Sequence, residues 1–195
     1  MANVDRPAGL KPVKYLSGAP WNGKANVYFV PDTDATALFK GDPVKSAGGA
    51  DPTGKYPTVV QAAAGEAVRG VVIGFGEEPF VMVNPTNSDR THRPANAAMY
   101  VMVVDDPNVI FEVQEDSDGG ALTADAIGSS ADLVVGAGDV KSGRSGVELD
   151  SSSAATVAAT CKILRAVNRE DNELGDHCKF EVLIAEHEMK LATGV

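Results

Sequence analysis

The sequence has few of the residues on which several kinds of protein depend. Its 195 residues include two cysteines, three histidines and one tryptophan. Two cysteines are too few for a disulfide scaffold or for a zinc site built on thiolates. No run of about 18 apolar residues occurs, so no membrane-spanning helix and no membrane partner are expected. The first residues, MANVDRPAGLKPVKYL, lack the apolar core of a secretion signal, which predicts a protein that folds and acts without export.

Motifs for nucleotide binding and nucleophilic catalysis are also incomplete. GRSG at 143–146 resembles a nucleophile elbow, but Val147 stands where that motif needs glycine, so the segment is interpreted as a loop. IGFGEEP at 73–79 lacks the third glycine of a dinucleotide fingerprint, and Pro79 would block the helix that holds the phosphates. No catalytic residue, cofactor or cofactor-binding residue is predicted.

The three histidines do not predict a metal site. His177 and His187 lie ten residues apart on one predicted segment, which is roughly 33 Å along a strand. They therefore cannot share an ion within one chain. His92 lies between Arg90 and Arg93, a poor environment for a cation.

The acidic pair Asp105 and Asp106 lies within YVMVVDDPNVIFEVQED, residues 100–116. Apolar residues alternate on both sides of Asp-Asp-Pro-Asn, which predicts a hairpin with Pro107 and Asp106 shaping its turn. Acidic residues are common at such turns. The pair is therefore interpreted as structural, and the protein is not expected to be an enzyme; a hydrolase that uses Asp105 or Asp106 is the less favoured alternative.

Residues 154–168 fit either a helical stripe or a strand, and the frequent Thr, Val and Ile favour a strand. Its partner would be KFEVLIAEHEM, residues 179–189, across the acidic turn NREDNELGD. In that hairpin the position opposite Cys161 is near residue 183. Cys161 and Cys178 are therefore predicted to be buried free thiols.

Charge is distributed unevenly along the chain. Residues 1–104 hold 10 Lys and Arg against 9 Asp and Glu, a balance of +1, whereas residues 105–195 hold 7 against 18, a balance of −11. The second half would repel phosphate, so no nucleic-acid partner is expected. Residues 1–24 are locally basic, with four Lys and Arg against Asp5.

Short apolar segments separated by glycine and proline turns predict a mainly β protein. Residues 25–31 are expected to form a strand, 36–75 several short strands, 84–98 a long surface loop, 121–128 a two-turn helix, and 136–153 a loop-rich connection. The predicted organisation is an extended N-terminal arm, residues 1–24, and one β-rich domain, residues 25–195. This domain is expected to be a single β-barrel or a jelly-roll-like β-sandwich.

The arm is rich in proline, which excludes it from a central strand position. It nevertheless carries apolar and aromatic side chains that are expected to be buried, either on its own domain or on a partner. Five of its residues are candidates for contacts with a partner or between subunits: Arg6, Lys11, Lys14, Tyr15 and Trp21.

Several segments together resemble the decoration, or cement, proteins that stabilise the heads of tailed bacteriophages. They are RPAGLKPVKYLSGAPWNG, LFKGDPVK, AAAGEAVRGVVIGF, YVMVVDDPNVIFEVQED, GRSGVELDSS and DNELGDHCKFEVLIAEHEM, which cover most of the chain. The resemblance implies a structural virion protein made in the host cytoplasm. It would sit on the outer capsid surface and bridge major capsid subunits, as a homo-oligomer for which a trimer is favoured over a dimer.

The acidic domain agrees with a surface that faces solvent, and the basic arm agrees with a segment that binds a neighbouring subunit. A different interpretation is a β-sandwich module that binds carbohydrate or a host surface through the loop at 84–98.

Overall fold

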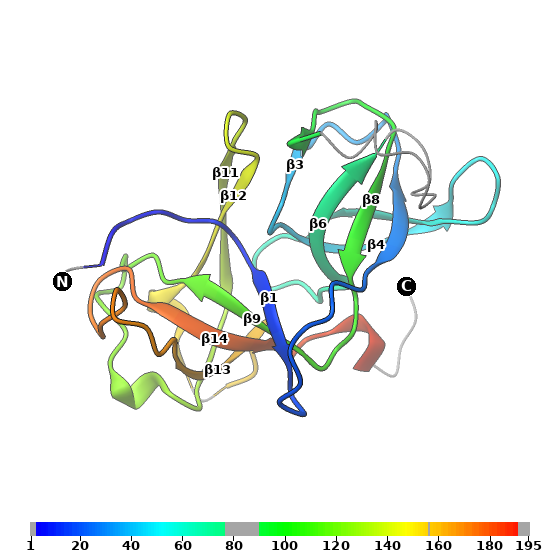
Figure 1. Cartoon of the computed structure of the whole chain (residues 1–195). Helices are drawn as coiled ribbons and strands as arrows, with labels where there is room; N and C mark the ends of the chain where they lie inside the picture. The colour runs from blue at the N-terminus through cyan, green and yellow to red at the C-terminus, as the bar shows by residue number, and fades with distance from the viewer. Residues whose placement is uncertain (1–2, 77–89, 156, 191–195) are drawn as a thin grey trace.

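The protein is built from β-strands that form two units lying side by side (Figure 1). The computed structural model describes residues 3–76, 90–155 and 157–190. Within these ranges the only helical segments are short 3-10 turns, η2 (Ala124–Ala126), η3 (Ser151–Ser153) and η4 (Glu188–Lys190), and none is long and apolar enough to cross a membrane. The predicted mainly β fold is confirmed.

The first unit is a closed barrel. Its strands are β2 (Asn26–Val30), β5 (Pro57–Gln61), β4 (Pro43–Ala50), β6 (Gly70–Gly76) and β8 (Met99–Val104), in the order β2-β5-β4-β6-β8. Only the β2–β5 pair is parallel. The strand expected at residues 25–31 is β2. Closure removes the free sheet edges that five short strands would otherwise expose.

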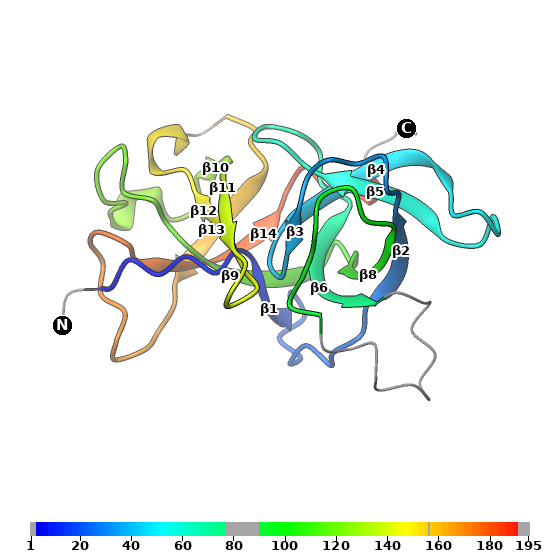
Figure 2. The same cartoon turned by 90° about the horizontal axis from the view of Figure 1, so that it is seen from above.

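The second unit is a five-stranded antiparallel sheet in the order β1-β9-β14-β13-β10. Its strands are β1 (Lys11–Tyr15), β9 (Val109–Gln114), β14 (Lys179–Ile184), β13 (Cys161–Ala166) and β10 (Ser130–Ala131). The hairpin β11 (Leu133–Asp139) and β12 (Arg144–Leu149) stands between the two units (Figure 2). Strand β3 (Leu38–Phe39) pairs with β7 (His92–Arg93).

The N-terminal segment is part of the sheet. Leu10 is almost fully buried in the core of the sheet, and β1 forms the edge of that sheet beside β9. An edge position tolerates Pro12, which has no amide hydrogen to donate. Of the two burial sites considered for the arm, its own domain or a partner, the structure shows the first for Leu10.

Two apolar cores share the wall between the units. On neighbouring strands β6 and β8, Val72 and Val103 point into the barrel, whereas Val71 and Val104 join the core of the sheet. Because successive side chains of a strand point to opposite faces, one wall can serve both cores. Each fully buried valine or phenylalanine contributes about 1.5–3 kcal/mol of burial free energy.

The predicted hairpin at residues 100–116 is wrong in its pairing and right in its turn. Asp106 shapes the turn, because its carboxylate accepts the amide of Asn108 at 2.8 Å and its carbonyl accepts the amide of Val109 at 3.1 Å. The flanking strands, however, do not pair with each other. Strand β8 belongs to the barrel and β9 to the sheet, so the turn is the crossover between the two units.

The other structural predictions from the sequence were partly right and partly wrong. Strands β13 and β14 pair as predicted, with Cys161 opposite Ile184, and both cysteines are buried and free. The loop expected at 136–153 is wrong, since most of it forms the β11–β12 hairpin, and Ser145 of GRSG lies in β12. The helix expected at 121–128 is reduced to the single turn η2. Residues 84–89 of the loop expected at 84–98 lie outside the described residues.

A close approach of two backbone segments joins the N-terminal segment to the barrel. The amide of Leu10 donates to the carbonyl of Gly41 at 2.9 Å, and the amide of Gly41 donates to the carbonyl of Val72 at 2.8 Å. Gly41 has a φ of +102°, and a Cβ atom there would lie 2.5 Å from the carbonyl oxygen of Ala8. Glycine is required at this crossing by both its conformation and its space.

Replacing Gly41 by alanine is expected to lower the free energy of unfolding by on the order of 2 kcal/mol, measured by urea denaturation. Gly54→Ala is the matched control, because Gly54 has a φ of +72° and nothing within 4 Å of the added carbon. The control retains the conformational strain and lacks the steric clash. Equal losses in the two variants would show that the crossing is not tightly packed.

Asp42, next to this crossing, is 1% exposed, and its carboxylate accepts the amide of Phe39 at 2.8 Å and Nε2 of Gln61 at 3.1 Å. Burial raises the pKa of Asp42 to about 6, against the opposing effects of Ser145, the Phe39 amide and Gln61. This value exceeds the pKa of about 3.9 expected in the unfolded chain, so the folded state binds the proton more tightly. The stability linked to that proton is present below about pH 4 and is lost as the pH rises through about 6.

Asp42→Asn removes this titration. The unfolding free energy of the wild type, relative to that of the variant, is expected to fall by on the order of 2 kcal/mol between pH 4 and pH 7.5. Urea denaturation of both proteins at each pH measures the difference, in which the titrations of all other groups cancel. A difference that does not change with pH would contradict the raised pKa.

Candidate functional site

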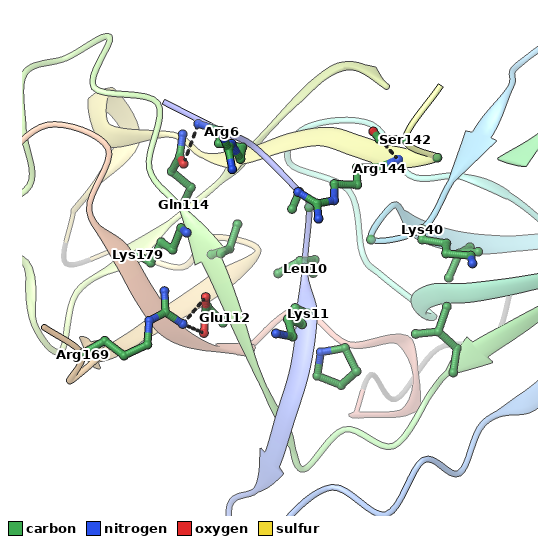
Figure 3. A pocket seen from close by; sticks show the side chains of 18 residues that line it. Arg6, Leu10, Lys11, Lys40, Glu112, Gln114, Ser142, Arg144, Arg169 and Lys179 are labelled. Atoms are coloured by element: carbon green, nitrogen blue, oxygen red, sulfur yellow. Dashed lines mark hydrogen bonds and ion pairs between the residues drawn. The ribbon is translucent and has the colours of Figure 1, made fainter. Parts of the chain in front are cut away.

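The most distinctive surface feature is a pocket of about 510 Å³ where the N-terminal segment meets both units (Figure 3). Its walls come from the N-terminal segment, the turn between β3 and β4, strands β6, β9 and β14, and the tip of the β11–β12 hairpin. Its basic residues are Arg6, Lys11, Lys40, Arg144, Arg169 and Lys179, and its acidic residue is Glu112. We refer to it as the basic pocket.

One cation of the basic pocket is neutralised within the protein. Nη1 of Arg169 lies 3.0 Å from both carboxylate oxygens of Glu112, and its Nε lies 2.9 Å from Asp171. The hydrogen bond with Asp171, and then those with Glu112, raise the pKa of Arg169. Glu112, the acidic side chain of the pocket, is thereby already paired.

The other five cations form no ion pair with any described residue. They are Arg6, Lys11, Lys40, Arg144 and Lys179. Like charges held close together repel one another, and an anion placed among them removes that repulsion. The pocket therefore has the electrostatic character of an anion-binding site, on a chain whose net charge is −10.

Backbone contacts bring two of these cations together from distant parts of the sequence. The amide of Lys40 donates to the carbonyl of Gly143 at 3.1 Å, and the carbonyl of Lys40 accepts the amide of Ser145 at 3.0 Å. Lys40 and Arg144 thus face each other across a parallel bridge. On the opposite side of the N-terminal segment lie Lys179 and Arg169 (Figure 3).

The five arm residues predicted as contacts separate into two groups. Arg6 and Lys11 line the basic pocket. Lys14 is instead paired with Glu181 at 2.7 Å, while Tyr15 donates to Asn22 at 2.9 Å. Trp21 donates to the carbonyl of Lys24 at 3.3 Å. Tyr15 and Trp21 also pack against the core of the sheet, so these aromatic residues support their own fold.

Four pocket cations were not predicted from the sequence: Lys40, Arg144, Arg169 and Lys179. Each is an isolated basic residue, and no local motif distinguishes it from an ordinary surface lysine or arginine. The one local signal is weak, since Lys40 and Arg144 each stand next to a glycine that permits a close backbone approach.

Asp105 and Asp106, the acidic pair at the crossover turn, both form hydrogen bonds within the fold. Asp105 accepts hydrogen bonds from Asn26 at 2.8 Å and from the Tyr28 hydroxyl at 2.6 Å, and it lies 3.8 Å from Arg69. Burial, followed by the contact with Asp105, raises the pKa of Tyr28 to about 12. Asp105 thus anchors β2 to the crossover.

Comparison with known proteins gives no relative: no family model, no curated protein and no solved structure matches this chain. Its function is therefore inferred from its residues and their geometry.

The unpaired cations predict binding of multivalent anions. Tripolyphosphate is expected to bind the protein and to raise its melting temperature more than sodium chloride at equal ionic strength. Arg144→Gln is expected to weaken that binding about two- to fivefold, as removal of one exposed charge partner does. The control is Lys162→Gln, because Lys162 is exposed on β13 outside the pocket. Equal weakening in both variants would indicate a general charge effect.

Proposed function

We propose that the protein is a non-enzymatic structural subunit that decorates and stabilises the outer surface of a bacteriophage capsid, bridging major capsid subunits. The observation that carries the proposal is the basic pocket, with five unpaired cations on an otherwise acidic molecule. Its complement is an acidic segment on the outer face of the major capsid protein. The order of segments that resemble decoration proteins supports the same assignment.

The distribution of charge suits this place on a shell. The strongly acidic second half of the chain repels DNA, while the basic pocket, to which that half contributes Arg144 and Lys179, would face the partner. Opposite potentials steer the encounter and set its register.

Many copies on a lattice bind stably through modest interfaces when each copy touches several subunits. A homotrimer matches such a lattice. This oligomeric state rests on the resemblance to decoration proteins.

Binding to isolated heads of the encoding phage, prepared without this protein, tests the proposal. The wild type is expected to cosediment with the heads, and Arg144→Glu to lose at least about tenfold in affinity, because like charges then meet across the interface. Lys162→Glu makes the same change of charge outside the pocket and is expected to bind as the wild type does. Point variants are preferable to removal of residues 1–24, because Leu10 is part of the core.

The wild type tests capsid decoration itself, and the Arg144→Glu variant tests whether the basic pocket is the docking site. Failure of the wild type to bind heads would overturn the proposed function, and glycan binding in its place would favour the carbohydrate-binding interpretation. Undiminished binding by Arg144→Glu would retain capsid decoration and exclude the basic pocket as the docking site.

A further inference from the structure

Beside the basic pocket, three potential metal ligands converge from distant parts of the chain. They are Asp5 of the N-terminal segment, Glu148 of β12 and His177 in the turn before β14, with ligand atoms that all lie within 4.8 Å of one another. The sequence predicted no metal site here, because it offered only His177 and His187 as a pair. The fold supplies a different set.

One ring nitrogen of His177 lacks a hydrogen-bond partner. This nitrogen, Nδ1, is buried and forms no hydrogen bond. The nearest carboxylate oxygen, Oδ1 of Asp5, lies 3.9 Å away, which is beyond hydrogen-bonding distance. Buried polar atoms in folded proteins nearly always have a partner, so this nitrogen calls for an explanation.

The two carboxylates are held beside that nitrogen by Gln114, which is 3% exposed. Its Nε2 donates to Oδ1 of Asp5 at 3.0 Å and to Oε1 of Glu148 at 2.9 Å, while its Oε1 accepts the amide of Arg6 at 3.0 Å. Each carboxylate retains further lone pairs for another ligand. Hydrogen bonds of this kind orient the carboxylates that bind metals in proteins.

The charges at the cluster also favour a cation. Two carboxylates held together repel each other when both are ionised, and a bound cation replaces this repulsion with attraction.

We propose that Asp5, Glu148 and His177 bind a divalent transition-metal ion, zinc in the first instance. Zinc binds imidazole nitrogen at about 2.0–2.1 Å and carboxylate oxygen at about 2.0–2.2 Å, so two ligand atoms of a tetrahedral ion lie about 3.4 Å apart. Nδ1 of His177 and Oδ1 of Asp5 lie 3.9 Å apart, so a shift of about half an ångström by the Asp5 carboxylate brings them to that separation. Imidazole favours zinc, copper and nickel over magnesium and calcium.

The ion would tie the N-terminal segment to the β11–β12 hairpin and to the turn before β14. Asp5 is the most exposed of the three ligands, with 62% of its side chain accessible. Its neighbour Arg6 lines the basic pocket, so the ion would also restrain one wall of that pocket. This inference does not depend on the proposed function.

Titration calorimetry of the full chain with zinc chloride tests the site, with magnesium chloride in parallel. One zinc ion is expected to bind per chain and to slow hydrogen exchange in residues 4–10. The affinity for zinc is expected to fall at least about tenfold in Asp5→Asn or His177→Asn. Asparagine suits position 177 because His177 has a φ of +58°, a conformation that asparagine adopts more readily than most residues. Magnesium is expected to bind far more weakly.

The matched control is Asp125→Asn, which removes an exposed carboxylate from η2, away from the cluster. It is expected to bind zinc as the wild type does. Cobalt(II) provides a second measurement, because coordination by the protein changes its visible absorption, and the change should disappear in His177→Asn. Absence of zinc binding by the folded wild type, or undiminished binding by either ligand variant, would overturn the site.

Discussion

The crossing of two backbones at Gly9 and Gly41 is the contact on which the arrangement of the molecule depends. There the N-terminal segment meets the barrel without intervening side chains, and Leu10 donates to the carbonyl of Gly41. Ser145 of the β11–β12 hairpin lies against the same point, since a Cβ atom on Gly9 would be 2.6 Å from its Cβ. Three parts of the chain are thereby held together, and the cations of the basic pocket surround them.

The shared wall of β6 and β8 makes the relation between the units rigid enough to shape a pocket. Valines on one face of this wall fill the barrel, and valines on the other face fill the core of the sheet. A displacement of the units would disturb both cores together. The spacing of Lys40, Arg144 and Lys179 is therefore set by apolar packing, although these charged residues contribute little to that packing.

Local chemistry in the sequence was sufficient for some features and insufficient for others. The Asp106 turn was predictable because an aspartate next to proline satisfies its own backbone. The pairing of its flanking strands was not, because a turn does not decide which distant strand offers the better apolar face. The β11–β12 hairpin was missed because Gly136, Gly138 and Gly146 weaken the alternation of apolar and polar residues. Those glycines allow close contacts that are visible only in the fold.

By itself the sequence determined the mainly β class, the positions of several strands and turns, the buried free cysteines and the change from near-neutral to strongly acidic charge. These features depend on residues within a few positions of one another, or on composition alone. Only the tertiary structure decided the strand partners, the basic pocket and the cluster of Asp5, Glu148 and His177. Each site joins residues of the N-terminal part of the chain to residues more than 100 positions later, and their convergence is a property of long-range packing that no local pattern encodes.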